Sequence, residues 1–254
     1  MTDLITSGRL ELGIARGAYS FEYERLMPGM DAWEAGQRLR EIIPAIRELW
    51  KGDYSHEGEF YSFPKSTSTP KPLQQNGPPI WIAARDPNSH EFAINNSCNV
   101  QVTPLWQDYN EVQDLIMKFN SAKKKCNPQS QSKIMLLQHT YVSDEQNELD
   151  EAAKKFSEFY AHFGAWFQNQ RPVNQASIKK LSSKELSLLD MYAPEKMKKN
   201  LLFGTIDEVT SRLKDYEKLG YDEFSYWIDS GMSYDEKVSS LNNFIQRVMP
   251  AFKS

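Results

Sequence analysis

The sequence predicts an α/β protein built on a parallel sheet, and three kinds of observation support this fold class. Short apolar runs have the length of strands, and the run from Pro78 to Ala84 is apolar at consecutive positions, as in strands buried on both faces. A helix-start signal, Asp86 followed by Pro87, comes directly after this run. Strand and helix patterns then alternate along the chain, which favours parallel strands joined by helical crossovers.

The strand assignments depend on apolar or alternating runs bounded by glycine, proline or polar residues. The first run alternates Leu10, Leu12 and Ile14 with other residues and closes at Gly17. The expected strands lie at residues 9–15, 79–84, 99–103, 134–142 and 222–228.

The helix assignments depend on helical spacing of apolar residues and on signals at the helix ends. One helix should end at Gly52 and be kinked by Pro44, and another should end at Gly220. Capping boxes are expected at four helix starts: Asp108 with Glu111, Ser143 with Gln146, Thr205 with Glu208, and Ser233 with Glu236.

Two segments interrupt the alternation of strand and helix. Residues 53–79 are aromatic, polar and proline-rich without a period, and we expect an ordered excursion there with a small hairpin around Glu57 and Gly58. Residues 164–200 are rich in Lys and Ser and too long for a simple loop, so we expect an insertion that carries two short helices.

Composition and charge exclude several classes of protein. The chain has 254 residues, of which 40% are hydrophobic and 25% charged, as expected of one globular domain with a substantial core. Its net charge is −4 and its basic residues are dispersed apart from Lys123–Lys125, which argues against nucleic-acid binding. Two cysteines cannot build a disulfide framework, and no apolar run has membrane length. These features, with no signal sequence, predict a cytoplasmic protein.

A parallel sheet of this kind can close in two ways, as a doubly wound open sheet or as a barrel. The chain length matches a (β/α)₈ barrel, whereas five expected strands do not. The patterns alone leave both closures open.

Several motifs, in order along nearly the whole chain, resemble those of the bacterial luciferase-like flavin monooxygenases. They are Ser7–Gly17, Glu48–Gly52, Pro70–Gln74 leading into Pro78–Ala84, Phe203–Thr205, and Val248–Pro250. The resemblance implies one domain over residues 1–254, with a (β/α)₈ TIM-barrel fold and an insertion before the last strand, where residues 164–200 fall.

In that family the first strand found here is the fourth. The resemblance therefore implies that three βα units are lacking ahead of Met1, in a truncated relative. The alternative is a naturally short relative with a rebuilt barrel.

The family binds FMN, usually reduced, with its phosphate near the carboxyl ends of the middle strands. The matching positions are Arg16, Gly17 and Ala18 after the first strand, and Arg85, Asp86 and Ser89 at the strand-to-helix corner. An arginine can grip a phosphate with two hydrogen bonds, and a glycine lets the backbone approach it closely. Asp86 departs from the family pattern, since some relatives carry a small hydroxyl residue at this position, and its charge opposes a phosphate at this helix start.

No residue of this chain can be assigned as the general acid or base, because the family's catalytic histidine would lie in the part that is missing. No histidine or cysteine spacing predicts a metal site. His139 lies on a strand and is expected to be a hydrogen-bonded core residue. Trp106, Tyr226 and Trp227 could line a substrate or flavin face, although aromatic residues near strand ends are more often part of the core.

The resemblance implies an enzyme, an FMN-dependent monooxygenase that takes reduced FMN from a separate flavin reductase and oxidises a small organic substrate with dioxygen. It also implies a homo- or heterodimer. Two alternatives stay open: a deazaflavin-dependent dehydrogenase of the same fold, and a non-catalytic flavin-binding or partner subunit.

Overall fold

The computed structural model describes residues 1–169, 171–228 and 231–252, which divide into two compact units. Unit 1 comprises Met1–Gln101 and Lys118–Lys133, and unit 2 comprises Val102–Met117 and Ile134–Ser254. Helix α5 (Tyr109–Cys126) therefore contributes residues to both. Among the described residues, no helix combines the length and apolar surface that crossing a bilayer requires.

Unit 1 is built on parallel strands, with β4 (Ile80–Ala83) between β1 (Leu12–Ile14) and β5 (Asn99–Val102). The register places Ile14 opposite Ile82, and Ile82 opposite Val100. Ile80 and Ile82 on one face are each 1% exposed and Trp81 on the other face is 5% exposed, so the strand predicted from the apolar run at residues 79–84 is confirmed as buried on both faces. The other elements of this unit include α1 (Thr2–Ile5), α2 (Ser20–Leu26), α3 (Ala32–Lys51) and α4 (Pro87–Asn95).

The excursion at residues 53–79 contains an antiparallel hairpin, β2 (Tyr54–Glu57) and β3 (Ser62–Ser66), which confirms the hairpin predicted around Glu57 and Gly58. Glu41 of α3 holds it in place. The Glu41 carboxylate accepts the N–H groups of Phe60 at 3.0 Å and Tyr61 at 2.8 Å, and His56 Nε2 donates to it at 3.0 Å. The excursion is thus anchored to a helix by partly buried polar contacts.

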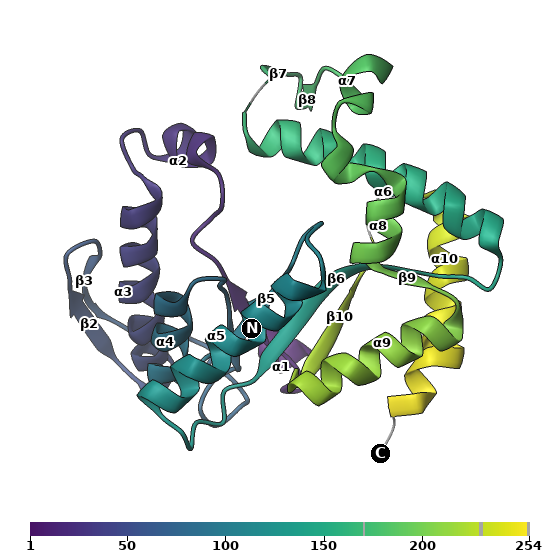
Figure 1. The fold of residues 1–254 in the computed structure, drawn as a ribbon. Helices are drawn as coiled ribbons and strands as arrows, with labels where there is room; N and C mark the ends of the chain where they lie inside the picture. The colour runs from purple at the N-terminus through teal and green to yellow at the C-terminus, as the bar shows by residue number, and fades with distance from the viewer. Residues whose placement is uncertain (170, 229–230, 253–254) are drawn as a thin grey trace. The chain divides into compact units, whose positions relative to one another are not determined.

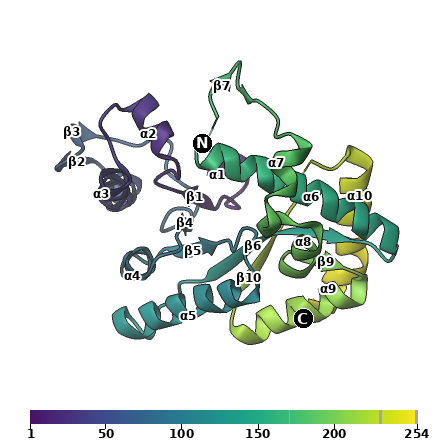
Figure 2. The ribbon, with the colours of Figure 1, turned by 45° about the horizontal axis from the view of Figure 1, so that its top comes forward.

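Unit 2 is built on β6 (Ile134–Val142), which pairs in parallel with both β9 (Leu202–Gly204) and β10 (Glu223–Trp227). The predicted strands at residues 134–142 and 222–228 are confirmed, but the prediction omitted β9. That strand is only three residues long, and such a short apolar run carries no period. Figure 1 shows α6 (Gln146–Phe167) running beyond the carboxyl ends of β6 and β10. Further helices of this unit are α8 (Pro194–Asn200), α9 (Ile206–Leu219) and α10 (Tyr234–Asn243), seen around β9 in Figure 2.

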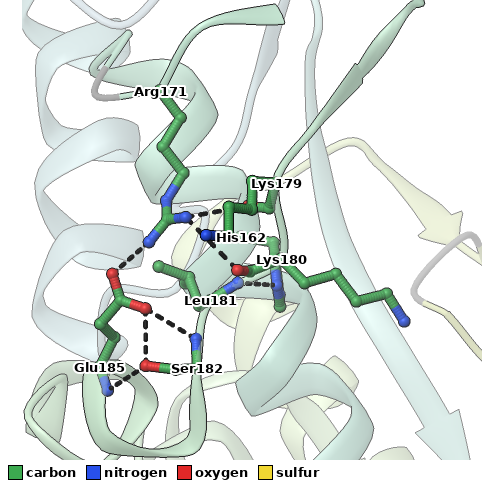
Figure 3. A network of polar contacts seen from close by, with 7 residues as sticks. All are labelled: His162, Arg171, Lys179, Lys180, Leu181, Ser182 and Glu185. Atoms are coloured by element: carbon green, nitrogen blue, oxygen red, sulfur yellow. Dashed lines mark hydrogen bonds and ion pairs between the residues drawn. The ribbon is translucent and has the colours of Figure 1, made fainter. Parts of the chain in front are cut away.

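The segment at residues 164–200, which we expect to be an insertion, begins inside α6, because this helix runs on to Phe167. It holds a short hairpin, β7 (Val173–Asn174) and β8 (Ser177–Ile178), then α7 (Ser183–Ser187), a 3₁₀ turn η1 (Asp190–Tyr192) and α8, so the two predicted short helices are confirmed. Figure 3 shows how polar contacts hold residues 179–182. Arg171 donates to Lys179 O and Lys180 O and pairs with Glu185, while His162 Nε2 accepts the Leu181 N–H at 3.0 Å.

The helix starts agree with the predicted capping boxes in part. The boxes at Thr205 with Glu208 and at Ser233 with Glu236 are confirmed, and Gly220 ends α9 in the left-handed conformation. Asp108 caps α5 by accepting the Asn110 N–H at 3.0 Å. The box at Ser143 with Gln146 is wrong. Ser143 Oγ instead donates to the carboxylate of Glu148, and α6 begins after its N-cap, Glu145.

Candidate functional site

The segment that leaves β1 is a fixed, exposed loop that contains Arg16, Gly17 and Ala18. Arg16 Nη1 donates to Tyr23 Oη at 3.3 Å and to the carbonyl of Ala32 at 3.0 Å, and Tyr23 Oη donates to the carbonyl of Gly17 at 2.7 Å. These bonds use one of the three guanidinium nitrogens and orient the side chain without burying it. The loop can therefore present a preorganised cation to a ligand.

Gly17 has φ +89°, a conformation that favours glycine. A Cβ at this position would also lie 3.0 Å from the ring of Tyr23. The conformation of the loop thus requires glycine at position 17, because the ring of Tyr23 fills the space where a side chain would begin.

The segment that leaves β4 is a capped helix start. Asp86 is the N-cap of α4 and Pro87 is its first residue, as the sequence predicted. Asp86 Oδ1 accepts the N–H of Ser89 at 3.0 Å. Partial burial opposes ionisation of Asp86, but hydrogen bonds from Ser89 and the charge of Arg40 outweigh it and lower the pKa of this carboxyl. An ionised carboxylate therefore occupies the N–H group that a phosphate at this helix start would use.

The register of β1 and β4 brings these two segments to neighbouring strand ends. Because Ile14 lies opposite Ile82 in a parallel pair, both segments leave the sheet at the carboxyl ends of neighbouring strands. The Arg16 loop fits a phosphate through its exposed cation and open backbone. The corner at Asp86 fits one only if the carboxylate turns away from Ser89, while Arg85 is half-buried there.

A second cluster lies in unit 2 where β10 ends beside β6, three residues before the last residue of β6. His139 lies opposite Trp227 in the register, and their rings stack with centroids 3.9 Å apart and planes 16° from parallel. The His139 side chain is fully buried, whereas Trp227 is partly exposed. His139 is therefore a buried support beneath an indole that reaches the surface.

His139 is held on its other sides by α6. Its Nδ1 lies 2.6 Å from Tyr160 Oη, and Phe156 and Phe159 meet its ring edge-on at centroid distances of 5.3 and 5.2 Å. Burial raises the pKa of Tyr160 well above its usual value, so the phenol stays protonated and can donate to Nδ1. The prediction of a hydrogen-bonded core histidine at position 139 is confirmed.

Two other aromatic residues considered from the sequence have structural partners. Tyr226 Oη lies 2.6 Å from Ser240 Oγ of α10, and its ring packs edge-on against Phe244, so it belongs to the helix-facing side of β10. Trp106 packs edge-on against Tyr160 and Tyr192 at centroid distances of 5.8 and 5.3 Å. Both contribute to packing, and Trp106 extends the aromatic cluster around Tyr160.

The sequence did not pair His139 with Trp227 or with Tyr160. Alternation along β6 and β10 could have placed His139 and Trp227 on inward-facing positions, but their register depends on the pairing of strands far apart in the chain.

Comparison with known proteins decides the family. A family model described as luciferase-like monooxygenase matches residues 1–223. The chain belongs to the luciferase-like monooxygenase family. This assignment confirms the family and the α/β, luciferase-like barrel type of fold that the sequence motifs predicted.

Individual relatives agree with the family assignment. The chain is 59% identical over 252 residues to the oxygenase component of the flavin-dependent trigonelline monooxygenase of Acinetobacter baylyi. The aligned residues make up 99% of this chain and 70% of that protein. In fold it is similar to the monooxygenase RslO1 of Streptomyces bottropensis, with a TM-score of 0.75 at 22% identity over 99% of this chain and 71% of that one.

A further structural relative is the oxygenating constituent of 3,6-diketocamphane monooxygenase of Pseudomonas putida, in complex with FMN. Its TM-score is 0.69 at 15% identity, over 98% of this chain and 72% of that one. At this identity the likeness concerns the fold alone. With the trigonelline monooxygenase relative, the family confirms the predicted function class, a flavin-dependent monooxygenase.

Proposed function

We propose that this luciferase-like protein is the oxygenase component of a two-component monooxygenase, which uses reduced FMN and dioxygen to oxidise trigonelline or a closely related pyridinium carboxylate. The observation that carries the proposal is the 59% identity to the trigonelline monooxygenase component over 99% of the chain. Because that relative is an oxygenase component, we propose that a separate flavin reductase supplies the reduced FMN. A dimer and a cytoplasmic location remain predictions from the sequence.

The FMN phosphate is proposed to bind between the two segments that leave β1 and β4. Arg16 donates charge-assisted hydrogen bonds from the guanidinium nitrogens that Tyr23 and Ala32 do not engage. Gly17 and Ala18 allow the backbone of the same exposed loop to approach the phosphate.

On the β4 side, Arg85 partly offsets the negative charge of Asp86, and Ser89 adds a hydroxyl at the start of α4. For a phosphate to reach the Ser89 N–H, the Asp86 carboxylate must release it. Asp86 is thus proposed to weaken FMN binding, as suits a component that receives its flavin from another protein and returns it.

When bound, reduced FMN supplies the electrons for the reaction with dioxygen. This chain's residues hold it by the phosphate, and the buried rings of His139 and Tyr160 exclude water from the face of Trp227 that His139 covers.

The test is a pair of titrations and a turnover assay on the purified protein. Photoreduced FMN and reduced deazaflavin are titrated separately, and trigonelline is then added with dioxygen while its oxidised product is followed by mass spectrometry. We expect retention of reduced FMN and incorporation of ¹⁸O from labelled dioxygen. Retention of deazaflavin alone, with no labelled product, would instead favour the dehydrogenase alternative.

A further inference from the structure

The two faces of the sheet in unit 2 are chemically different. Gln138 of β6 accepts a hydrogen bond from Tyr216 of α9, and Tyr226 of β10 contacts Ser240 of α10, so these positions face the helices. Since side chains alternate along a strand, their neighbours face the opposite side. The residues of this opposite face are Met135, Leu137 and His139 of β6, and Glu223, Ser225 and Trp227 of β10.

This opposite face is partly exposed along its length and ends in the stacked pair. All its members except His139 are partly exposed, and His139 and Trp227 are the last register pair of β6 and β10. In barrels of this type, ligand sites lie at the carboxyl ends of the strands. The stacked pair is therefore where a bound substrate ring would meet the sheet.

The indole of Trp227 is held as a rigid surface. One of its faces is covered by the imidazole of His139 at 3.9 Å. That imidazole is fixed in turn by Tyr160 Oη at 2.6 Å and by the edges of Phe156 and Phe159. A ring whose support cannot shift loses little conformational freedom when a ligand stacks on it.

We propose that Trp227 is the substrate-stacking residue of this enzyme and binds a planar, permanently cationic pyridinium ring, with His139 and Tyr160 as its positioning residues. An indole face attracts cations through its quadrupole more strongly than any other side chain, and a pyridinium adds planarity that favours offset stacking. The inference rests on the proposed function and deepens it, because it assigns recognition of the ring charge to one residue.

The experiment compares two ligands on variants of position 227. Trigonelline carries the fixed ring charge, whereas nicotinate has the same ring and carboxylate without it at neutral pH. Wild type should bind trigonelline more tightly in calorimetry. Trp227→Leu should lower trigonelline affinity by about tenfold and nicotinate affinity by clearly less, since both ligands lose a stacking surface but only trigonelline loses the cation–π attraction.

Trp227→Phe keeps an aromatic ring and should lose only part of the preference for trigonelline over nicotinate. This variant therefore tests the stacking role even if the leucine variant has a folding defect. Tyr160→Phe removes the bond to His139 Nδ1 and should raise KM for trigonelline while binding of reduced FMN stays constant. Tyr226→Phe is the matched control, since Tyr226 is on the same strand but faces α10, and it should leave both affinities unchanged.

The outcomes separate the two proposals. If wild type oxidises trigonelline and Trp227→Leu binds it as tightly as wild type, the stacking role is wrong and the proposed function stands. If Trp227→Leu instead weakens the binding of reduced FMN and leaves trigonelline affinity unchanged, Trp227 contacts the flavin and the inference is overturned. If wild type binds and oxidises no pyridinium compound, both fail.

Discussion

The loops at the strand ends of unit 1 and the aromatic cluster of unit 2 are opposite kinds of site. Arg16 and Asp86 are exposed, charged and held by hydrogen bonds to residues nearby in the sequence. His139 and Tyr160 are buried and held by rings from several elements. The difference indicates that the first region can change ligand affinity without loss of the fold, whereas the second carries fold and recognition together. The predictions below test this contrast.

The largest expected effect is on stability in the aromatic cluster. Phe156 is 1% exposed and packs edge-on against Phe203 and His139, at 4.7 and 5.3 Å between ring centroids. Phe156→Ala should lower the free energy of unfolding by about 3–5 kcal/mol, because it leaves a cavity that the surrounding rings cannot fill. Urea unfolding measures this, and Phe156→Leu should cost clearly less. A loss no greater than that of Arg16→Ala would show that the two regions do not differ as described.

The next effect is on affinity in the loop of unit 1. Arg16→Ala should weaken FMN binding by removing a charge-assisted contact of about 1.5–3 kcal/mol, or roughly ten- to a hundredfold. Stability should change little, because the side chain is exposed. Fluorescence titration with FMN measures the loss.

Riboflavin is the control for Arg16, since it lacks the phosphate. It should bind weakly and be indifferent to the substitution. Equal losses for FMN and riboflavin would mean that Arg16 only shapes the loop through Tyr23 and Ala32.

At the α4 corner, Asp86→Ser should tighten FMN binding by up to about tenfold. Serine caps a helix about as well as aspartate, so the substitution removes the charge and keeps the cap. Ser89→Ala should do the reverse and weaken binding by on the order of 1 kcal/mol. The same titration reports both, and unchanged FMN affinity in Asp86→Ser would place the phosphate away from this helix start.

The smallest effect is a pH dependence beneath the same corner. Burial lowers the pKa of His90, whose Nε2 donates to the carbonyl of Ala84 at 3.2 Å and whose Nδ1 has no hydrogen-bond partner among the described residues. The unfolded chain binds a proton near pH 6.5, and the folded chain binds it only at lower pH. The contribution of neutral His90 to the free energy of unfolding is therefore complete above about pH 6.5, and it is lost as pH falls through the pKa of His90 in the folded protein.

His90→Gln keeps a donor near Ala84 and removes the titration. Its unfolding free energy should fall less than that of wild type between pH 7.5 and 5, measured by urea midpoints. Parallel curves for the two proteins would assign the acid sensitivity to other groups.

Much of the fold and part of the candidate site follow from local patterns. The run Ile80–Ala83 and the cap at Asp86 were predictable, because burial on both faces and helix capping each need only a few consecutive residues. The boxes at Thr205 and Ser233 follow from the same kind of short-range chemistry. The false box at Ser143 shows the limit of such signals. A hydroxyl three residues before a polar side chain caps a helix only if the helix begins directly after the hydroxyl residue, whereas the N-cap of α6 is Glu145 and Ser143 Oγ donates to Glu148.

The sequence by itself determined the strand and helix order apart from β9, the family motifs and the residues proposed to hold a phosphate, since these depend on neighbours along the chain. Only the tertiary structure decided that His139 lies beneath Trp227 and that Tyr160 fixes it, because the register of β6 with β10 and the position of α6 bring together residues between 21 and 88 positions apart. Contacts between distant segments depend on the packing of whole elements, and no local pattern specifies them.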